Sequence, residues 1–272
     1  MRIFKNILDF YIESSLHVAF AVYALIQVTF FSLNIYYDVT VAYFGFFGTV
    51  VGYNFVKYFT VAFKNDALIR SKIKEIVFLS CIALAACLYF FLQLRRNTQI
   101  VALIFFGLTL LYTLPFSSRQ KNVRNWKGIK IYIVSITWVG VTLLLPIVEN
   151  NIPFSTDVLV MVLQRFLLIF TMVLVFDVID LKHDDHSLQT IPQQIGVKTT
   201  KKLGYVLLFL LLLFEFFYTN NHHFLPLFFK LLVCGTIAIF TFFANENRSR
   251  YYASFWLESV PILWWLVLVV FR

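Results

Sequence analysis

The chain has 272 residues and a formal net charge of +9, and 60% of its residues are hydrophobic while 14% are charged. No soluble core needs so large an apolar share. The composition therefore excludes an ordinary soluble protein and predicts a polytopic integral membrane protein, built as one transmembrane helical domain over residues 1–272. The positive charge is accounted for by membrane topology and by an anionic membrane surface, so nucleic-acid binding is not needed to explain it.

The apolar residues gather in nine segments that are predicted to cross the bilayer. A helix needs roughly 20 apolar residues to span a hydrocarbon core of about 30 Å. The predicted spans are residues 15–33, 40–63, 75–94, 99–118, 129–148, 156–177, 203–218, 224–244 and 254–271. The expected fold is therefore all-α, a polytopic bundle of nine transmembrane helices.

Lysine and arginine are distributed unequally between the two ends of this predicted bundle. The N-terminus and the connections after the even-numbered spans hold most of them, whereas the opposite end has only Arg95, Arg96 and Arg272. Because positively charged loops stay in the cytoplasm, we expect a cytoplasmic N-terminus and an external C-terminus. The expected location is a bacterial inner membrane.

The second predicted span contains Lys57, an unusual cation for a membrane segment, one turn from Asn54 on the same helical face. Charges inside a membrane are costly, and they are usually functional and usually also paired. Lys57 is therefore interpreted either as a contact to an anionic substrate or as one half of a structural ion pair.

The fourth predicted span ends at Tyr112-Thr-Leu-Pro115, and a basic run follows that includes Arg119 and Lys121. Tyrosine presents a phenol at the membrane interface, and proline ends or kinks a helix. The basic residues could receive a diphosphate, to which arginine makes bidentate contacts. They are equally typical of a cytoplasmic loop beside an interfacial tyrosine.

The most informative stretch follows the sixth predicted span. There Asp177, Asp180 and Asp184 have the spacing i, i+3, i+7, which would place them on one face if the helix continued for two turns. Three neighbouring carboxylates repel one another unless they share a cation, and hard oxygen ligands favour Mg²⁺. The alternative interpretation is a solvated acidic loop that caps a helix.

Other charged residues also fall within the predicted spans. Arg165 lies twelve residues before Asp177, about three turns deeper on a similar helical face. It could face the same cavity as Asp177, or it could pair with Glu215 or Glu258. Lys230 and Glu258 lie close enough to span ends to be partly solvated.

Two of these segments resemble the UbiA-type intramembrane prenyltransferase superfamily. Its second aspartate-rich motif reads Asp-x-x-Asp-x-x-x-Asp, followed by Thr-x-Pro and a glycine. Those places are filled here by Asp177, Asp180, Asp184, Thr190, Pro192 and Gly196. The segment at Tyr112 is similar to the family's Tyr-Ser-x-Pro. The resemblance implies Mg²⁺ held by the three aspartates, Tyr112 near the reacting carbon, and a central cavity that opens to the cytoplasm. It makes Arg119 and Lys121 candidate diphosphate contacts.

The chain departs from the family at its first motif, Asn-Asp-x-x-Asp-x-x-x-Asp. Asn54 is present, but Phe55, Tyr58 and Ala62 stand where the aspartates would be. This loss removes most of one metal site, and Asn54 alone would support the diphosphate. Lys57 would then contact the diphosphate in place of a metal, or it would pair with an aspartate of the second motif.

The resemblance thus predicts a Mg²⁺-dependent enzyme that transfers a prenyl group from a prenyl diphosphate to an aromatic or lipid-like acceptor within the lipid bilayer. The alternative is a catalytically impaired homologue that binds lipids or isoprenoids or acts as a scaffold. The missing first motif favours the alternative, and three aligned aspartates favour the enzyme, because idle carboxylates at a membrane boundary are only costly. A transporter is disfavoured, since no pair of broken helices repeats between two halves.

Overall fold

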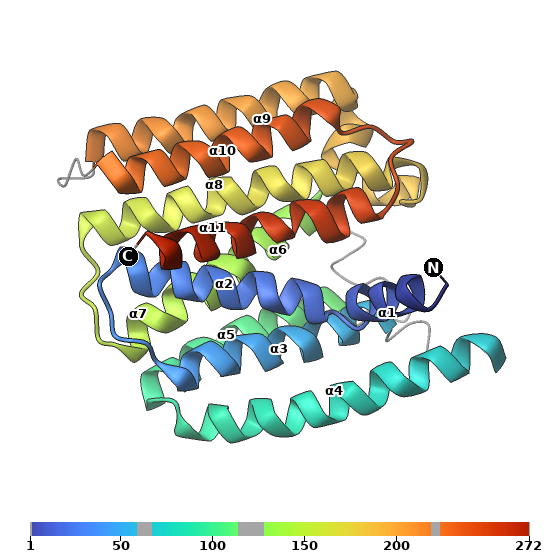
Figure 1. The fold of residues 1–272 in the computed structure, drawn as a ribbon, viewed down its shortest axis with the longest axis horizontal. Helices are drawn as coiled ribbons and strands as arrows, with labels where there is room; N and C mark the ends of the chain where they lie inside the picture. Colours follow the sequence, from blue (N-terminus) through green and yellow to red (C-terminus); the bar gives the residue numbers. More distant parts are fainter. Residues whose placement is uncertain (1, 59–66, 114–127, 219–223, 272) are drawn as a thin grey trace.

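The computed structural model describes residues 2–58, 67–113, 128–218 and 224–271, and in these residues the regular structure is entirely helical. The long helices run side by side along one direction (Figure 1). They are α1 (Arg2–Glu13), α2 (Leu16–Ser32), α3 (Val39–Tyr58), α4 (Ala67–Gln93), α5 (Arg96–Thr113), α6 (Ile129–Val139), α7 (Leu145–Glu149), α8 (Thr156–Ile179), α9 (Ile191–Tyr218), α10 (Phe224–Phe243) and α11 (Ser259–Val270). Shorter pieces are the π-helical turns η2 (Gly140–Leu144) and η5 (Tyr252–Leu257) and the 3₁₀ turns η3 (Asp180–Lys182) and η4 (His186–Leu188).

Several of these helices are long and apolar enough to cross a membrane, which confirms the predicted class. Among the described residues, five qualify by themselves, at Val39–Tyr58, Ile73–Gln93, Ile129–Glu149, Thr156–Lys182 and Tyr252–Val270. A sixth is added if α1 and α2, which meet at an angle of 57°, form one broken span. The predicted total of nine spans goes beyond this count and stays a prediction.

The other predicted spans are also helical, but polar residues or a short described length keep them below the length and hydropathy of a full span. The described part of α5 begins with four polar residues, 96–99, and its predicted end lies outside the described residues. The kinked helix α9 carries Lys201, Lys202 and Glu215. Described side chains in α10 begin only at Leu227, which leaves an apolar helix shorter than a full span.

Helix α1 is a separate amphipathic helix that the predicted spans did not include. Ile3, Phe4 and Ile7 form one exposed apolar face, and acidic residues lie on the opposite side. Such a pattern is typical of a helix that lies in the membrane interface. The chain turns from α1 into α2 at Ser15, which has a left-handed backbone with φ of 63°.

The core of the bundle is built around α2 and α8. Helix α8 is apolar on nearly all sides, and 67% of its span is buried, whereas only 11% of the α4 span is buried. A helix that is apolar all round belongs in the interior, so α8 is central and α4 lies at the edge (Figure 1). Helix α2 packs against α3 and α11, and α8 packs against α6 and α9.

The connections divide between two ends of the bundle (Figure 1). Helix α1 and residues 180–190 and 244–251 lie at one end of the bundle. We call this end the α1 end. Residues 33–38, residues 150–155 and the C-terminus lie at the other end. This division agrees with the alternation expected of successive spans, and which end faces the cytoplasm stays a prediction.

Candidate functional site

The aspartate-rich stretch folds as a tight turn at the end of α8. Asp177 is in the last turn of α8, but the α-helix ends at Ile179 and does not continue for the two turns on which the predicted alignment depended. The backbone carbonyl of Asp180 accepts hydrogen bonds from the amides of His183 and Asp184, at 2.7 and 2.8 Å. This turn brings Asp184 back towards Asp177.

Lys130 joins two of the three aspartates. Its Nζ lies 2.9 Å from Asp177 Oδ1 and 3.3 Å from Asp184 Oδ2. The side chain of Asp177 is only 2% exposed, so its negative charge has almost no contact with solvent. Water stabilises a carboxylate strongly, and the ammonium of Lys130 replaces much of that stabilisation.

The position of Lys130 is set by Gly128, just before α6. Gly128 has φ of 68°, a conformation that residues with a side chain rarely adopt. Its amide donates a 3.0 Å hydrogen bond to the carbonyl of Leu188, in the segment that follows the aspartates. The first turn of α6 is thereby fixed against the turn that carries Asp184. In the sequence, Lys130 follows the basic run, and no local pattern indicates that it pairs with residues 47 and 54 positions later.

The rest of the resembling motif has local structural functions. The amide of Thr190 donates to Gln193 Oε1 at 2.9 Å, and Gln193 Nε2 donates to the carbonyl of Asp184 at 3.3 Å. Pro192 lies in the first turn of α9, where a missing amide hydrogen costs nothing. Gly196 interrupts the helical backbone of α9. Its φ of 77° belongs to a conformation that residues with a side chain rarely adopt.

Asn54 and Lys57 contact the junction between α1 and α2. Asn54 Nδ2 donates to the carbonyl of Ser14 at 3.0 Å and to Ser80 Oγ at 2.9 Å, and its Oδ1 is buried without a hydrogen-bond partner. Lys57 Nζ donates to Ser15 Oγ at 3.0 Å. The described contacts of Lys57 do not include the aspartates, whose cation is Lys130. To bind a diphosphate, the side-chain amide of Asn54 would first have to break its hydrogen bonds to Ser14 and Ser80.

Aromatic residues lie near the Lys130–Asp177 pair. Tyr112 is 6% exposed and lies near Lys130 and Tyr53. Tyr53 Oη accepts a 2.6 Å hydrogen bond from Trp138 Nε1. The structure therefore brings Tyr112 together with the Lys130–Asp177 pair. Arg119 and Lys121 lie outside the described residues.

The donor chemistry of this site suits Mg²⁺, although a complete ligand set is not assembled. Carboxylate oxygens of Asp177 and Asp184 converge on one point, which the ammonium of Lys130 occupies. Mg²⁺ is usually bound by one or two carboxylates together with waters and substrate phosphates. Among the described residues, no group of three His, Cys, Asp or Glu side chains is arranged to hold a metal ion. A metal could use Asp177 and Asp184 if Lys130 moved aside.

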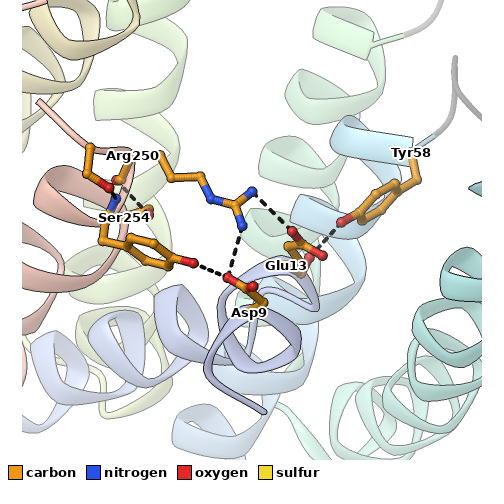
Figure 2. Close-up of polar contacts among 7 residues, drawn as sticks. Asp9, Glu13, Tyr58, Arg250 and Ser254 are labelled. Atoms are coloured by element: carbon orange, nitrogen blue, oxygen red, sulfur yellow. Dashed lines mark hydrogen bonds and ion pairs between the residues drawn. The ribbon is translucent and has the colours of Figure 1, made fainter. Parts of the chain in front are cut away.

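A second ionic cluster at the α1 end was missed by sequence analysis (Figure 2). Arg250 donates to Asp9 Oδ1 at 2.9 Å and to Glu13 Oε1 at 3.1 Å. Tyr251 also donates to Asp9, and Tyr58 donates to the backbone carbonyl of Glu13 at 2.9 Å. The spacing of Asp9 and Glu13, one helical turn apart, was the available signal that one cation could bridge both.

No family model, curated protein or solved structure matches this chain. The resemblance to the UbiA-type superfamily rests on the residues named above.

Proposed function

We propose that this protein transfers a prenyl group from a prenyl diphosphate to an aromatic or lipid-like acceptor within a bacterial inner membrane. In this proposal nine spans surround a central cavity, and the α1 end faces the cytoplasm. The observation that carries the proposal is the Lys130–Asp177–Asp184 cluster beside Tyr112. Ionised carboxylates are costly in such a position, and helix packing alone gives no reason for three of them.

The charges of the cluster are suited to a bound cation. Asp177, Asp180 and Asp184 carry three negative charges, and Lys130 supplies one positive charge. Asp177, Asp180 and Asp184 would together hold Mg²⁺. The bound ion would supply charge stabilisation for the diphosphate leaving group. Lys130, once released from the carboxylates, would donate hydrogen bonds to diphosphate oxygens.

The aromatic residues would serve the other half of the reaction. Trp138 on α6 is hydrogen-bonded to Tyr53 on α3, and Tyr112 on α5 lies near Tyr53. Aromatic faces attract cations, and an apolar enclosure keeps water away from an allylic cation. Tyr112 would therefore face the reacting carbon, as the resemblance implies. Arg119 and Lys121 would contribute further diphosphate contacts from the basic run.

The test is release of pyrophosphate by the purified protein in detergent, supplied with a prenyl diphosphate and Mg²⁺. Asp180→Asn keeps the shape of the side chain and removes its charge, so we expect turnover and Mg²⁺-dependent substrate binding to fall at least tenfold. Asp185→Asn is the matched control, because it makes the same change at the neighbouring acid outside the motif. Equal Mg²⁺-dependent binding by the parent and Asp180→Asn would refute the metal role.

The second candidate function is binding of an isoprenoid or lipid without catalysis. It is favoured by the pairing of Lys130 with the two carboxylates that a metal would use, and by the loss of the first motif. The same assay separates the two functions. A binding protein would retain labelled prenyl diphosphate or prenyl alcohol without releasing pyrophosphate, with or without Mg²⁺.

A further inference from the structure

Arg165 is a buried cation in the interior of the bundle, about 18 Å along α8 from Asp177. It is 5% exposed. Its NH1 donates to the carbonyl of Leu25 at 3.2 Å and to Thr142 Oγ1 at 3.1 Å, and its NH2 donates to Thr29 Oγ1 at 3.3 Å. All these acceptors are neutral. Within the described residues, no carboxylate lies within ion-pair distance of the guanidinium.

The neighbouring charges cancel one another and leave that of Arg165 uncompensated. Lys230 forms an ion pair with Glu215, and Gln164 Nε2 donates to Glu215 Oε2 at 2.9 Å. Lys230 also donates to Gln164 Oε1 at 3.2 Å. The cluster of Arg165, Lys230 and Glu215 therefore carries a net charge of +1. An uncompensated charge in a membrane interior is costly and points to a function.

This cluster borders a small cavity. The cavity has a volume of about 30 Å³, room for roughly two water-sized groups. Arg165, Lys230 and Gln164 form its polar side, and Leu168, Leu211 and Val233 are among its apolar walls. This volume is of the order of a small anionic group such as a carboxylate. The net charge of +1 matches a monoanion, and the apolar residues beside the polar groups would contact the start of a hydrocarbon chain attached to it.

We propose that this cavity binds the carboxylate of an amphiphile from the membrane, with the guanidinium of Arg165 as its counter-charge. The ligand class is a monoanionic carboxylate on an apolar chain, for which oleate is the probe. The site is separate from the aspartate cluster, so it holds whether or not the protein transfers prenyl groups. Loss of oleate binding and loss of pyrophosphate release can be measured independently.

The first experiment compares ligands on the unaltered protein in detergent. Equilibrium binding of radiolabelled oleate is expected to saturate at one molecule per chain. Unlabelled oleate should displace it, and oleyl alcohol, which has the same chain without the charge, should displace it at least tenfold more weakly. Equal displacement by the alcohol would overturn the proposal. Displacement by acetate at the same concentration as oleate would show that the site binds free small anions, and it would overturn the assignment of an amphiphile as the ligand.

The second experiment changes the charge of the cluster in both directions. Arg165→Gln removes the counter-charge, and oleate affinity should fall at least tenfold. Because Arg165 also holds α2 and η2, this variant could fail to fold, so Glu215→Gln provides an independent test. It preserves the hydrogen bond from Gln164, frees Lys230 and raises the net charge to +2, so oleate should bind several-fold more tightly.

The matched control is Arg250→Gln, which makes the Arg165→Gln change at the exposed cluster of the α1 end and should leave oleate affinity unchanged. A folded Glu215→Gln protein that binds oleate no more tightly than the parent would overturn the proposal. The proposal would also fail if Arg250→Gln reduced oleate affinity as much as Arg165→Gln does.

Discussion

Lys130 and Asp177 form a buried ion pair that joins the first turn of α6 to the last turn of α8, with 2.9 Å between Nζ and Oδ1. Asp184 shares the same ammonium at 3.3 Å. The pair has two consequences: it holds the aspartate turn against α6, and it competes with any metal that uses the same oxygens.

Replacement of Lys130 by methionine separates these two consequences. Lys130→Met leaves Asp177 buried without its counter-charge, and loss of one partner of a buried pair costs about 3–5 kcal/mol. The melting temperature in detergent should fall, and added Mg²⁺ should restore part of it, because the freed carboxylates bind a divalent cation more tightly. Lys182→Met is the control, since Lys182 pairs with Glu246 at an exposed position and such pairs contribute at most about 1 kcal/mol. An unchanged melting temperature for Lys130→Met would contradict the pairing.

Lys57 should prove less important for stability than Lys130. Its ammonium donates to Ser15, and Glu258 and Glu13 act on it only as more distant charges. We expect Lys57→Met to lower the melting temperature without substrate, by less than Lys130→Met does. The double variant Lys57→Met/Glu258→Gln should recover part of the loss, because it removes both charges. If Lys57→Met instead impaired only prenyl diphosphate binding, Lys57 would be a substrate contact.

The attachment of α1 should weaken in acid. The hydroxyl of Tyr251 and the guanidinium of Arg250 hold the pKa of Asp9 below its ordinary value of 3.8. A carboxyl whose pKa is lowered by folding stabilises the folded state above its unfolded pKa, and it loses this effect as the pH falls through the folded pKa. The attachment should therefore be intact at neutral pH and weaken below about pH 4.

Hydrogen exchange of residues 2–13 measures this attachment. Protection in the parent should fall towards that of Asp9→Asn as the pH drops below 4, and the two should differ most near neutral pH. Equal protection of both proteins at pH 7 would show that Asp9 does not hold α1.

Gly140 allows a close contact between η2 and α5. A Cβ atom at this position would lie 2.2 Å from the ring of Phe105. Gly140→Ala should therefore destabilise the protein by about 1–3 kcal/mol, and Phe105→Leu should rescue it in the double variant. Gly235→Ala is the control, because its Cβ would enter open space and alanine favours a helix. A Gly140→Ala protein as stable as the Gly235→Ala protein would contradict this packing.

The orientation of the bundle can be tested by labelling in a cysteine-free background. Tyr36→Cys places a thiol at an exposed position in the connection between α2 and α3, and Lys198→Cys places one near the start of α9. Lys198→Cys should react only from the cytoplasm and Tyr36→Cys only from outside, because the basic connections stay inside. The reverse pattern would overturn the predicted topology.

The sequence predicts the helices well where their cause is local. The run at 156–177 becomes α8, and the run at 129–148 becomes α6, η2 and α7, since an apolar segment of that length must form a helix to satisfy its backbone. Helix α1 was missed because its apolar residues recur on one face and never form a continuous run. The break in α9 at Gly196 was missed because a lone glycine carries no fixed conformation.

The candidate site was predictable only in part. The three aspartates and Tyr112 are recognisable in the sequence, but the cation that binds the aspartates is not. Lys130 lies 47 positions from Asp177, and its place depends on how α6 packs beside α8, which no local pattern encodes. The same holds for Arg250, which meets Asp9 and Glu13 from the far end of the chain.

The packing of α2 against α11 also affects biosynthesis. His17, in the first turn of α2, contacts the carbonyl of Phe255, in the turn η5 just before α11, at 2.9 Å across 238 positions of the chain. At about 5–20 residues per second, a ribosome needs on the order of ten seconds or more to make the intervening residues. During that time α1 and α2 must wait in or near the translocon without the partner that covers them. A nascent chain arrested before residue 250 should therefore leave α2 accessible to chaperones or lipid. This accessibility should be lost only once α11 has been inserted.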